Sequence, residues 1–220
     1  MTRRSQRIVV NALSSRSGGG LTYINNLLGG LQPEHDVEVF VLVAPVQVET
    51  INPGHATLIE CQWAGRSVVH RFLWERCVLP GVLEGLRADV YYAPGGSLTT
   101  RPPPGCGVAV AFRNLLPFSP KHRRLYRFGY TRLRLLVLRY LQARSFSRAD
   151  LVIAVGSTLE VEPAASVPRS AREHGAVYVI VNQGPTAHDQ LADLRIEGDA
   201  TQALPEAVDR CQRSGPIKAK

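Results

Sequence analysis

The chain of 220 residues lacks the features that several protein classes require. Its four cysteines are far apart and form no C-x-x-C pair, which argues against a zinc site and against a disulfide framework. No apolar run reaches the roughly 18 residues that a membrane-spanning helix needs. The apolar stretch Ile8–Leu13 is too short for a secretory signal. We therefore expect a cytoplasmic protein with reduced thiols, for which attachment to a membrane surface stays open.

Charge is unevenly distributed along the chain, whose formal net charge is +8. Residues 1–150 contain 19 Lys and Arg against 9 Asp and Glu, whereas residues 151–220 contain 7 against 9. Such a change of sign is typical of segments with different partners. The sequence therefore suggests a boundary near Asp150.

The pattern of apolar residues predicts an α/β fold. Arg7–Leu13 is predicted as a strand, Ser14–Gly20 as a glycine-rich loop, Leu21–Leu31 as a helix and Asp36–Val43 as a second strand, the unit that builds a parallel sheet. We expect a Rossmann-like, mostly parallel sheet with helices on both faces. The further strands expected are Thr57–Glu60, Ala88–Ala93, Val108–Phe112, Leu151–Val155 (buried), Ala176–Asn182 and Leu194–Ile196. The further helices expected are Val68–Leu86 (broken or kinked at Pro80), Lys121–Arg148, Pro163–Gly175 and Thr201–Arg213, before a frayed tail.

The predicted helix Lys121–Arg148 holds nine Lys and Arg and no acid, interleaved with Leu, Phe and Tyr. An amphipathic helix with a solvated face is the simplest interpretation. A surface for anionic membrane lipids is a second interpretation, because clustered arginines beside apolar side chains suit lipid headgroups. Nucleic-acid binding ranks last, because no motif for it is present.

Residues 1–150 resemble the N-terminal Rossmann-like domain of GT-B-type glycosyltransferases. The resemblance is carried by Ser17-Gly18-Gly19-Gly20-Leu21 with the helix after it, by Ala88–Gly95, by Arg113–Phe118 and by Arg144–Ile153. It implies that Gly18, Gly19 and Gly20 approach a diphosphate of a nucleotide-sugar, where a helix amino end favours negative charge. It also implies that Arg113 and Asn114 contact donor or acceptor beyond the end of a strand. A flexible turn and an ordinary surface Arg-Asn pair remain the alternatives.

The second domain of such an enzyme, which grips the nucleotide-sugar, has no counterpart here. Its signature is a pair of glutamates about seven residues apart, and Glu160 and Glu162 are too close together to match it. The resemblance therefore implies that a separate chain would have to supply the donor domain.

Residues 151–205 resemble the C-terminal part of the sirtuin NAD-dependent deacylase domain. The matching stretches are Val155–Ala165, Gly175–Asn182, Pro185-Thr186 with Asp189, and Ala192–Ala200. The resemblance implies that NAD contacts Gly156, Ser157, Thr158, Asn182, Asp199 and Ala200, with weak affinity, because only part of the domain is present. In the family, hydroxyls and amides of the first turn serve phosphate or ribose, and the Gly-Asp-Ala turn lies against the adenine.

Deacylase activity is not expected. A sirtuin needs a catalytic His before Gly, and the His174-Gly175 pair of this chain stands at the wrong place in the family order. The four zinc cysteines of the family are also missing, so we expect no metal.

Three hypotheses about the whole chain follow. The first is a glycosyltransferase-like domain (1–150) joined to a sirtuin-like NAD-binding segment (151–205) and a C-terminal end (206–220), not catalytically competent alone. The second is a sirtuin-related NAD-binding protein. The third is a non-catalytic fusion remnant. The stretch Ala149–Val155 matches a buried strand of both families, so a recombination there could keep one sheet in register.

Overall fold

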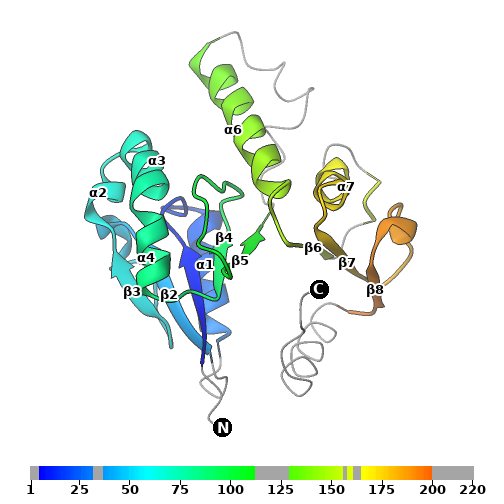
Figure 1. Cartoon of the computed structure of the whole chain (residues 1–220), viewed down its shortest axis with the longest axis horizontal. Helices are drawn as coiled ribbons and strands as arrows, with labels where there is room; N and C mark the ends of the chain where they lie inside the picture. The colour runs from blue at the N-terminus through cyan, green and yellow to red at the C-terminus, as the bar shows by residue number, and fades with distance from the viewer. Residues whose placement is uncertain (1–4, 32–36, 112–128, 156–157, 161–164, 200–220) are drawn as a thin grey trace.

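A computed structural model describes residues 5–31, 37–111, 129–155, 158–160 and 165–199. Within them, eight parallel strands form one sheet in the order β3-β2-β1-β4-β5-β6-β7-β8 (Figure 1). The strands are β1 (Gln6–Asn11), β2 (Val37–Val43), β3 (Thr57–Glu60), β4 (Val90–Ala93), β5 (Gly107–Val110), β6 (Leu151–Val155), β7 (Val177–Asn182) and β8 (Leu194–Glu197). The helices are α1 (Gly19–Gly29), α2 (Gln62–Gly65), α3 (Val68–Cys77), α4 (Leu79–Gly85), α6 (Tyr130–Phe146) and α7 (Ser166–Glu173), with 3-10 turns η1 (Pro45–Gln47) and η2 (Asp189–Leu191). The predicted α/β class with a parallel sheet is confirmed.

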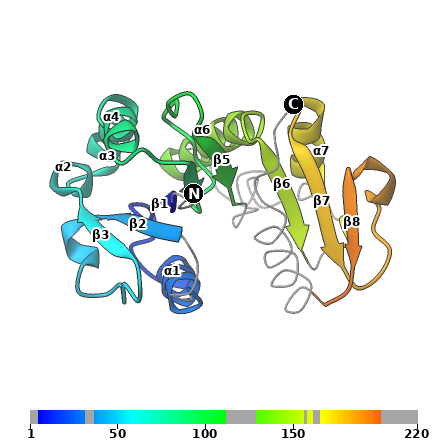
Figure 2. The same ribbon diagram turned by 60° about the horizontal axis from the view of Figure 1, so that its bottom comes forward.

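The first five strands have helices on both faces (Figure 2). Consecutive side chains of β1 point to opposite sides, so Val9 packs with Leu79 and Leu83 of α4, whereas Val10 packs with Ile24 and Leu28 of α1. All six of these side chains are buried. Two apolar cores, one on each face, therefore hold this part of the sheet.

The predicted helix Val68–Leu86 is two helices. Ser67 caps α3, because its hydroxyl accepts a hydrogen bond from the backbone N–H of His70 at 3.2 Å. Pro80 stands in the first turn of α4, where its missing N–H costs no helical hydrogen bond. The proline thus starts a new helix after α3.

The last three strands have one described helix layer. Val152 of β6 and Tyr178 and Ile180 of β7 are buried in a third core with Val167 and Ala171 of α7. On the opposite face, five apolar side chains are exposed, which are Leu151, Ile153, Val155, Val177 and Leu194.

The strand Leu151–Val155 is confirmed, but the prediction that it is buried is wrong for the face that carries Leu151, Ile153 and Val155. An unbroken apolar strand is typical of a sheet that is covered on both faces. Within the described residues, α7 covers only the face of β6 that carries Val152.

The two groups of strands meet at a narrow contact. β5 and β6 share a single register pair, Ala109 with Leu151, whereas β6 and β7 share five. The carboxylate of Asp150 adds a link by accepting a hydrogen bond from the Val108 N–H at 2.9 Å. The sheet is therefore continuous, but its strand pairing is shortest beside Asp150. No helix in the described ranges is long and apolar enough to cross a bilayer.

Candidate functional sites at the carboxyl edge of the sheet

The strand order reverses beside β1, because β2 lies on one side of it and β4 on the other. Open α/β sheets bind ligands outside the carboxyl ends of their strands at such a point. A cavity of about 910 Å³ lies there, lined by the ends of β1 and β4, the amino end of α1, and the helices α3 and α6. We call this cavity the switch-point cleft.

Two of the predicted loop glycines, Gly19 and Gly20, line this cleft. Gly18 has φ +58° and ψ −147°, a backbone conformation that is essentially restricted to glycine. A Cβ at Gly20 would lie 3.3 Å from the Cα of Ser15, so loop and helix approach closely there and a side chain would be tightly packed. The N–H groups of Leu21 and Thr22 donate to the Gly18 carbonyl. Among the described interactions, those of Gly19 and Gly20 have no acceptor, as is usual at a helix start.

A buried polar network forms the floor of the cleft. The side-chain amide of Asn11, the last residue of β1, donates to Glu75 at 3.0 Å and to the Tyr91 hydroxyl at 2.8 Å. The hydroxyl of Thr99 donates to the other oxygen of Glu75, and the guanidinium of Arg71 lies 3.8 Å from this carboxylate. Burial raises the pKa of Tyr91, and the charge of Glu75 raises it further.

None of these network residues was predicted from the sequence. Asn11 at a strand end was a usable signal, but Glu75 and Thr99 reach it only through the tertiary fold. Arg113 and Asn114, the other residues predicted for this region, lie outside the described residues.

The residues predicted to bind NAD lie beyond the ends of β6, β7 and β8. Asn182 is the last residue of β7 and is paired in register with Glu197 of β8. Its carbonyl accepts a hydrogen bond from Gly198 at 3.2 Å, and Asp199 accepts one from Gln183 at 3.2 Å. Thr158 follows β6 at the same edge, and its carbonyl accepts from the N–H of Ala187 at 2.9 Å. The structure therefore places Thr158, Asn182 and Asp199 along one edge, whereas Gly156, Ser157 and Ala200 lie outside the described residues.

Ionic contacts of Arg195 hold the loop between β7 and β8. Its guanidinium lies 3.1 Å from Asp189 and 3.0 Å from Glu197, and it donates to the Gly184 carbonyl at 3.1 Å. The hydrogen bond from the Thr186 hydroxyl is the main cause that lowers the pKa of Asp189, and Arg195 lowers it further. The loop is thus ordered beside the side chain of Asn182, whose amide donates to Gly184 at 2.9 Å.

A buried histidine anchors the same loop to the body of the protein. His188 is fully buried, with one ring nitrogen 3.1 Å from the guanidinium of Arg169 and the other 3.1 Å from the hydroxyl of Tyr178. An arginine can only donate, so Nε2 of His188 accepts and its Nδ1 carries the proton. Burial raises the pKa of Tyr178 to about 12.

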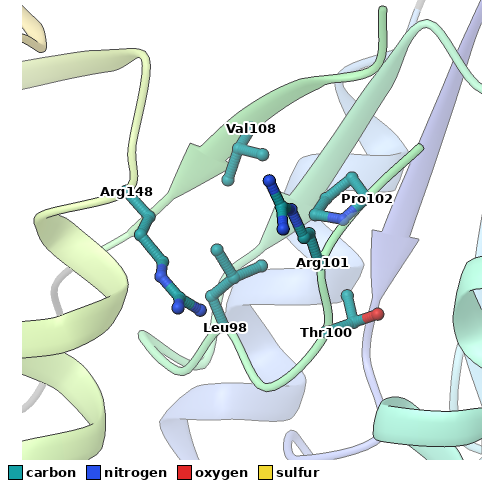
Figure 3. Close-up of a pocket in the computed structure, with 6 residues that line it drawn as sticks. All are labelled: Leu98, Thr100, Arg101, Pro102, Val108 and Arg148. Carbon is teal, nitrogen blue, oxygen red and sulfur yellow. The ribbon is translucent and has the colours of Figure 1, made fainter. Parts of the chain in front are cut away.

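A smaller cavity of about 440 Å³ lies beside the carboxyl end of α6, with Arg101 and Arg148 at its sides (Figure 3). Its lining contains no predicted site residue and no acid. Burial lowers the pKa of Arg148, and the charges of Arg144 and Arg101 lower it further. Arg144 and Arg148 stand where the negative end of the α6 dipole favours cations, which accounts for their position.

Comparison with known proteins gives sequence relatives for part of the chain. A stretch of 65 residues is 48% identical to NAD-dependent protein deacetylase 2 of Streptomyces coelicolor, which covers 29% of this chain and 27% of the relative. A stretch of 49 residues is 53% identical to the NAD-dependent protein deacetylase of Oceanobacillus iheyensis, covering 22% and 21%. The chain thus spans about a quarter of the length of the curated relatives that it matches. No protein-family model matches it.

Two solved structures align with the chain only at low TM-scores. A structure of Sir2Af2 bound to a myristoylated histone peptide aligns with a TM-score of 0.34 and 34% identity over 36% of this chain and 34% of that chain. A Sir2 enzyme structure aligns with a TM-score of 0.35 and 15% identity over 96% of this chain and 94% of that chain.

These relatives confirm the sirtuin part of the predicted resemblance and give no support to a glycosyltransferase origin of residues 1–150. Over about a quarter of its length, this chain is similar in sequence to NAD-dependent protein deacetylases of the sirtuin family.

Proposed function

We propose that the carboxyl edge of β6, β7 and β8 binds NAD or a related adenine nucleotide. The observation that carries this proposal is the placement of Thr158, Asn182 and Asp199 along one edge of a parallel sheet. The sirtuin resemblance assigns these residues to NAD, together with Gly156, Ser157 and Ala200. The identity of 48% over 65 residues to an NAD-dependent deacetylase supports the same ligand.

The chemistry of Asn182 suits a ribose. Its side-chain N–H donates to the Gly184 carbonyl, which fixes the amide and leaves its oxygen to accept a hydrogen bond from a ribose hydroxyl. Thr158 is exposed and supplies a hydroxyl that can donate to a phosphate or a ribose. ADP-ribose contains the riboses, phosphates and adenine of NAD and lacks only the nicotinamide, so it is expected to bind about as well as NAD.

Deacylase activity is not part of this proposal. His174, which precedes Gly175, is exposed at the carboxyl end of α7, and its ring contacts the Ser170 carbonyl at 2.7 Å as a helix-capping group. In the described ranges, no group of three or more His, Cys, Asp and Glu is arranged to hold a metal ion. What we propose for this part of the chain is a binding function.

The binding constant of ADP-ribose, measured by calorimetry on the full chain, tests this proposal. Asn182→Ala should weaken binding by about tenfold, since one hydrogen bond to the ligand is worth about 1 kcal/mol or more. Asn26→Ala, an exposed position of α1, serves as the control and should leave the binding constant unchanged. Equal binding by the wild type and Asn182→Ala would contradict a binding site at this edge.

A second candidate function is favoured by one observation, the position of Gly19 and Gly20 in the switch-point cleft. We propose that residues 1–150 hold a sugar nucleotide or its acceptor there, with a separate chain supplying the donor domain. Saturable binding of UDP-glucose or GDP-mannose that Gly19→Ala weakens would support it. Absence of binding for both sugar nucleotides would contradict it.

A further inference from the structure

Helix α6 carries apolar side chains on two opposite sides. Its inner side is held to the body of the protein, because Leu135 and Phe146 are buried and the buried hydroxyl of Ser145 accepts a hydrogen bond from the backbone N–H of Leu98 at 2.6 Å. Figure 1 shows that the amino half of α6 projects beyond the strands. Its outer side carries a row of apolar side chains that are 41–64% exposed, which we call the outer stripe and which comprises Leu133, Leu136, Val137 and Tyr140.

Arginines border the outer stripe on both flanks. The members of the stripe are spaced three, one and three residues apart, which places them on one side of a helix with about 3.6 residues per turn. The same geometry places Arg134 on one flank and Arg139 on the other, and it places Arg144 one turn beyond Tyr140 on the side of the stripe. All three arginines are exposed, and the helix contains no acid. Exposed apolar side chains bordered by arginines are typical of a helix that lies in a membrane interface.

Four arginines from three elements gather beyond the end of the outer stripe. They are Arg76 of α3, Arg101 of the loop before β5, Arg144 of α6 and Arg148 just after it. Burial lowers the pKa of Arg148, and the charges of its three arginine neighbours lower it further. Figure 3 shows Arg101 and Arg148 at the sides of the smaller cavity, whose lining contains no acid. Anions placed against this cluster would relieve the repulsion between its members.

We propose that the outer side of α6 binds the surface of an anionic membrane, with the outer stripe among the acyl chains and the arginines at the lipid headgroups. Nucleic acid would satisfy the arginines but offers no apolar layer for the stripe. The balance of 19 Lys and Arg against 9 Asp and Glu in residues 1–150 supports an anionic partner, because it attracts one over a longer range. This inference goes beyond nucleotide binding at β6–β8 and does not depend on it.

Cosedimentation of the full chain with lipid vesicles tests the proposal. Vesicles of equal parts phosphatidylcholine and phosphatidylserine should bind the chain at least about tenfold more tightly than vesicles of phosphatidylcholine alone, because each arginine at an anionic surface strengthens binding several-fold. Raised salt should weaken this binding, since it screens the charges. Equal binding to the two kinds of vesicle would overturn the proposal.

Matched charge variants separate this surface from general attraction. Arg139→Gln combined with Arg144→Gln removes two charges beside the outer stripe and should weaken binding to the anionic vesicles by at least about tenfold. The control, Arg66→Gln combined with Arg87→Gln, removes two charges from exposed positions outside α6 and should weaken it much less. Equal loss in the two double variants would mean that net charge alone causes binding and would contradict the proposal.

A second matched pair tests the apolar contact. Leu133→Gln, at a 61% exposed position, should weaken vesicle binding by about tenfold, whereas Val177→Gln, at the 50% exposed first residue of β7, should not. Every variant should keep the circular dichroism spectrum of the wild type, so that lost binding is not lost folding. A dimer in solution that Leu133→Gln dissociates, without any vesicle binding, would assign the outer stripe to a second copy of the chain and overturn the proposal.

Discussion

At the residue scale, two asparagines hold corresponding positions at the ends of parallel strands. Asn11 ends β1 and Asn182 ends β7, and both side chains are fixed by hydrogen bonds. Asn182 was predicted as a site residue because it stands in a sequence motif. Asn11 was not, because its partners Glu75 and Tyr91 lie 64 and 80 residues away in the chain. The role of Asn182 at the site stays a prediction, whereas a local pattern misses Asn11, whose polar network only the fold completes.

The contact between Tyr178 and His188 gives a stability prediction at this scale. Tyr178→Phe removes the acceptor of the His188 Nδ1–H in a fully buried position, and an unpaired buried donor costs about 1–3 kcal/mol. The free energy of unfolding, measured in urea, should fall by that amount. Tyr140→Phe, at a 64% exposed position of α6, is the control and should change it little. An unchanged stability of Tyr178→Phe would mean that this hydrogen bond does not anchor the loop.

At the element scale, strands were predicted better than helices. The apolar, β-branched runs of β1, β2 and β7 predicted their positions closely, because such a run is visible within a few consecutive residues. The helix expected at Val68–Leu86 is interrupted at Val78, since Pro80 is favourable only in a first turn. β6 shows the opposite limit, because its apolar composition predicted a buried strand, whereas Leu151, Ile153 and Val155 are exposed. Which helix covers a strand is decided by the whole fold.

At the scale of the whole molecule, the shortest strand pairing of the sheet, between β5 and β6, lies where the net charge of the sequence changes sign. The cores on β1–β5 and the core on β6–β8 are distinct, and Val110 packs against one core of each group. The charge change near Asp150 predicted a boundary of composition there. The charge change could not predict that β5 and β6 would be adjacent, because the pairing of strands across this boundary depends on tertiary packing.

This arrangement predicts that the two groups of strands unfold separately. Both tryptophans, Trp63 and Trp74, belong to the first group, so tryptophan fluorescence reports on it alone, whereas far-ultraviolet circular dichroism reports on both. Urea unfolding curves from the two signals should not coincide. Coincident curves with one midpoint would show that the single pair between β5 and β6 and the Asp150 contact couple the whole sheet.

The most direct test of the proposed function is amide hydrogen exchange of the full chain with and without NAD. Bound nucleotide should slow exchange in residues 158–160 and 182–199, at the carboxyl edge of β6–β8, and leave residues 14–20 and 93–99 around the switch-point cleft unchanged. Protection confined to the switch-point cleft, or no protection at saturating NAD, would contradict the account.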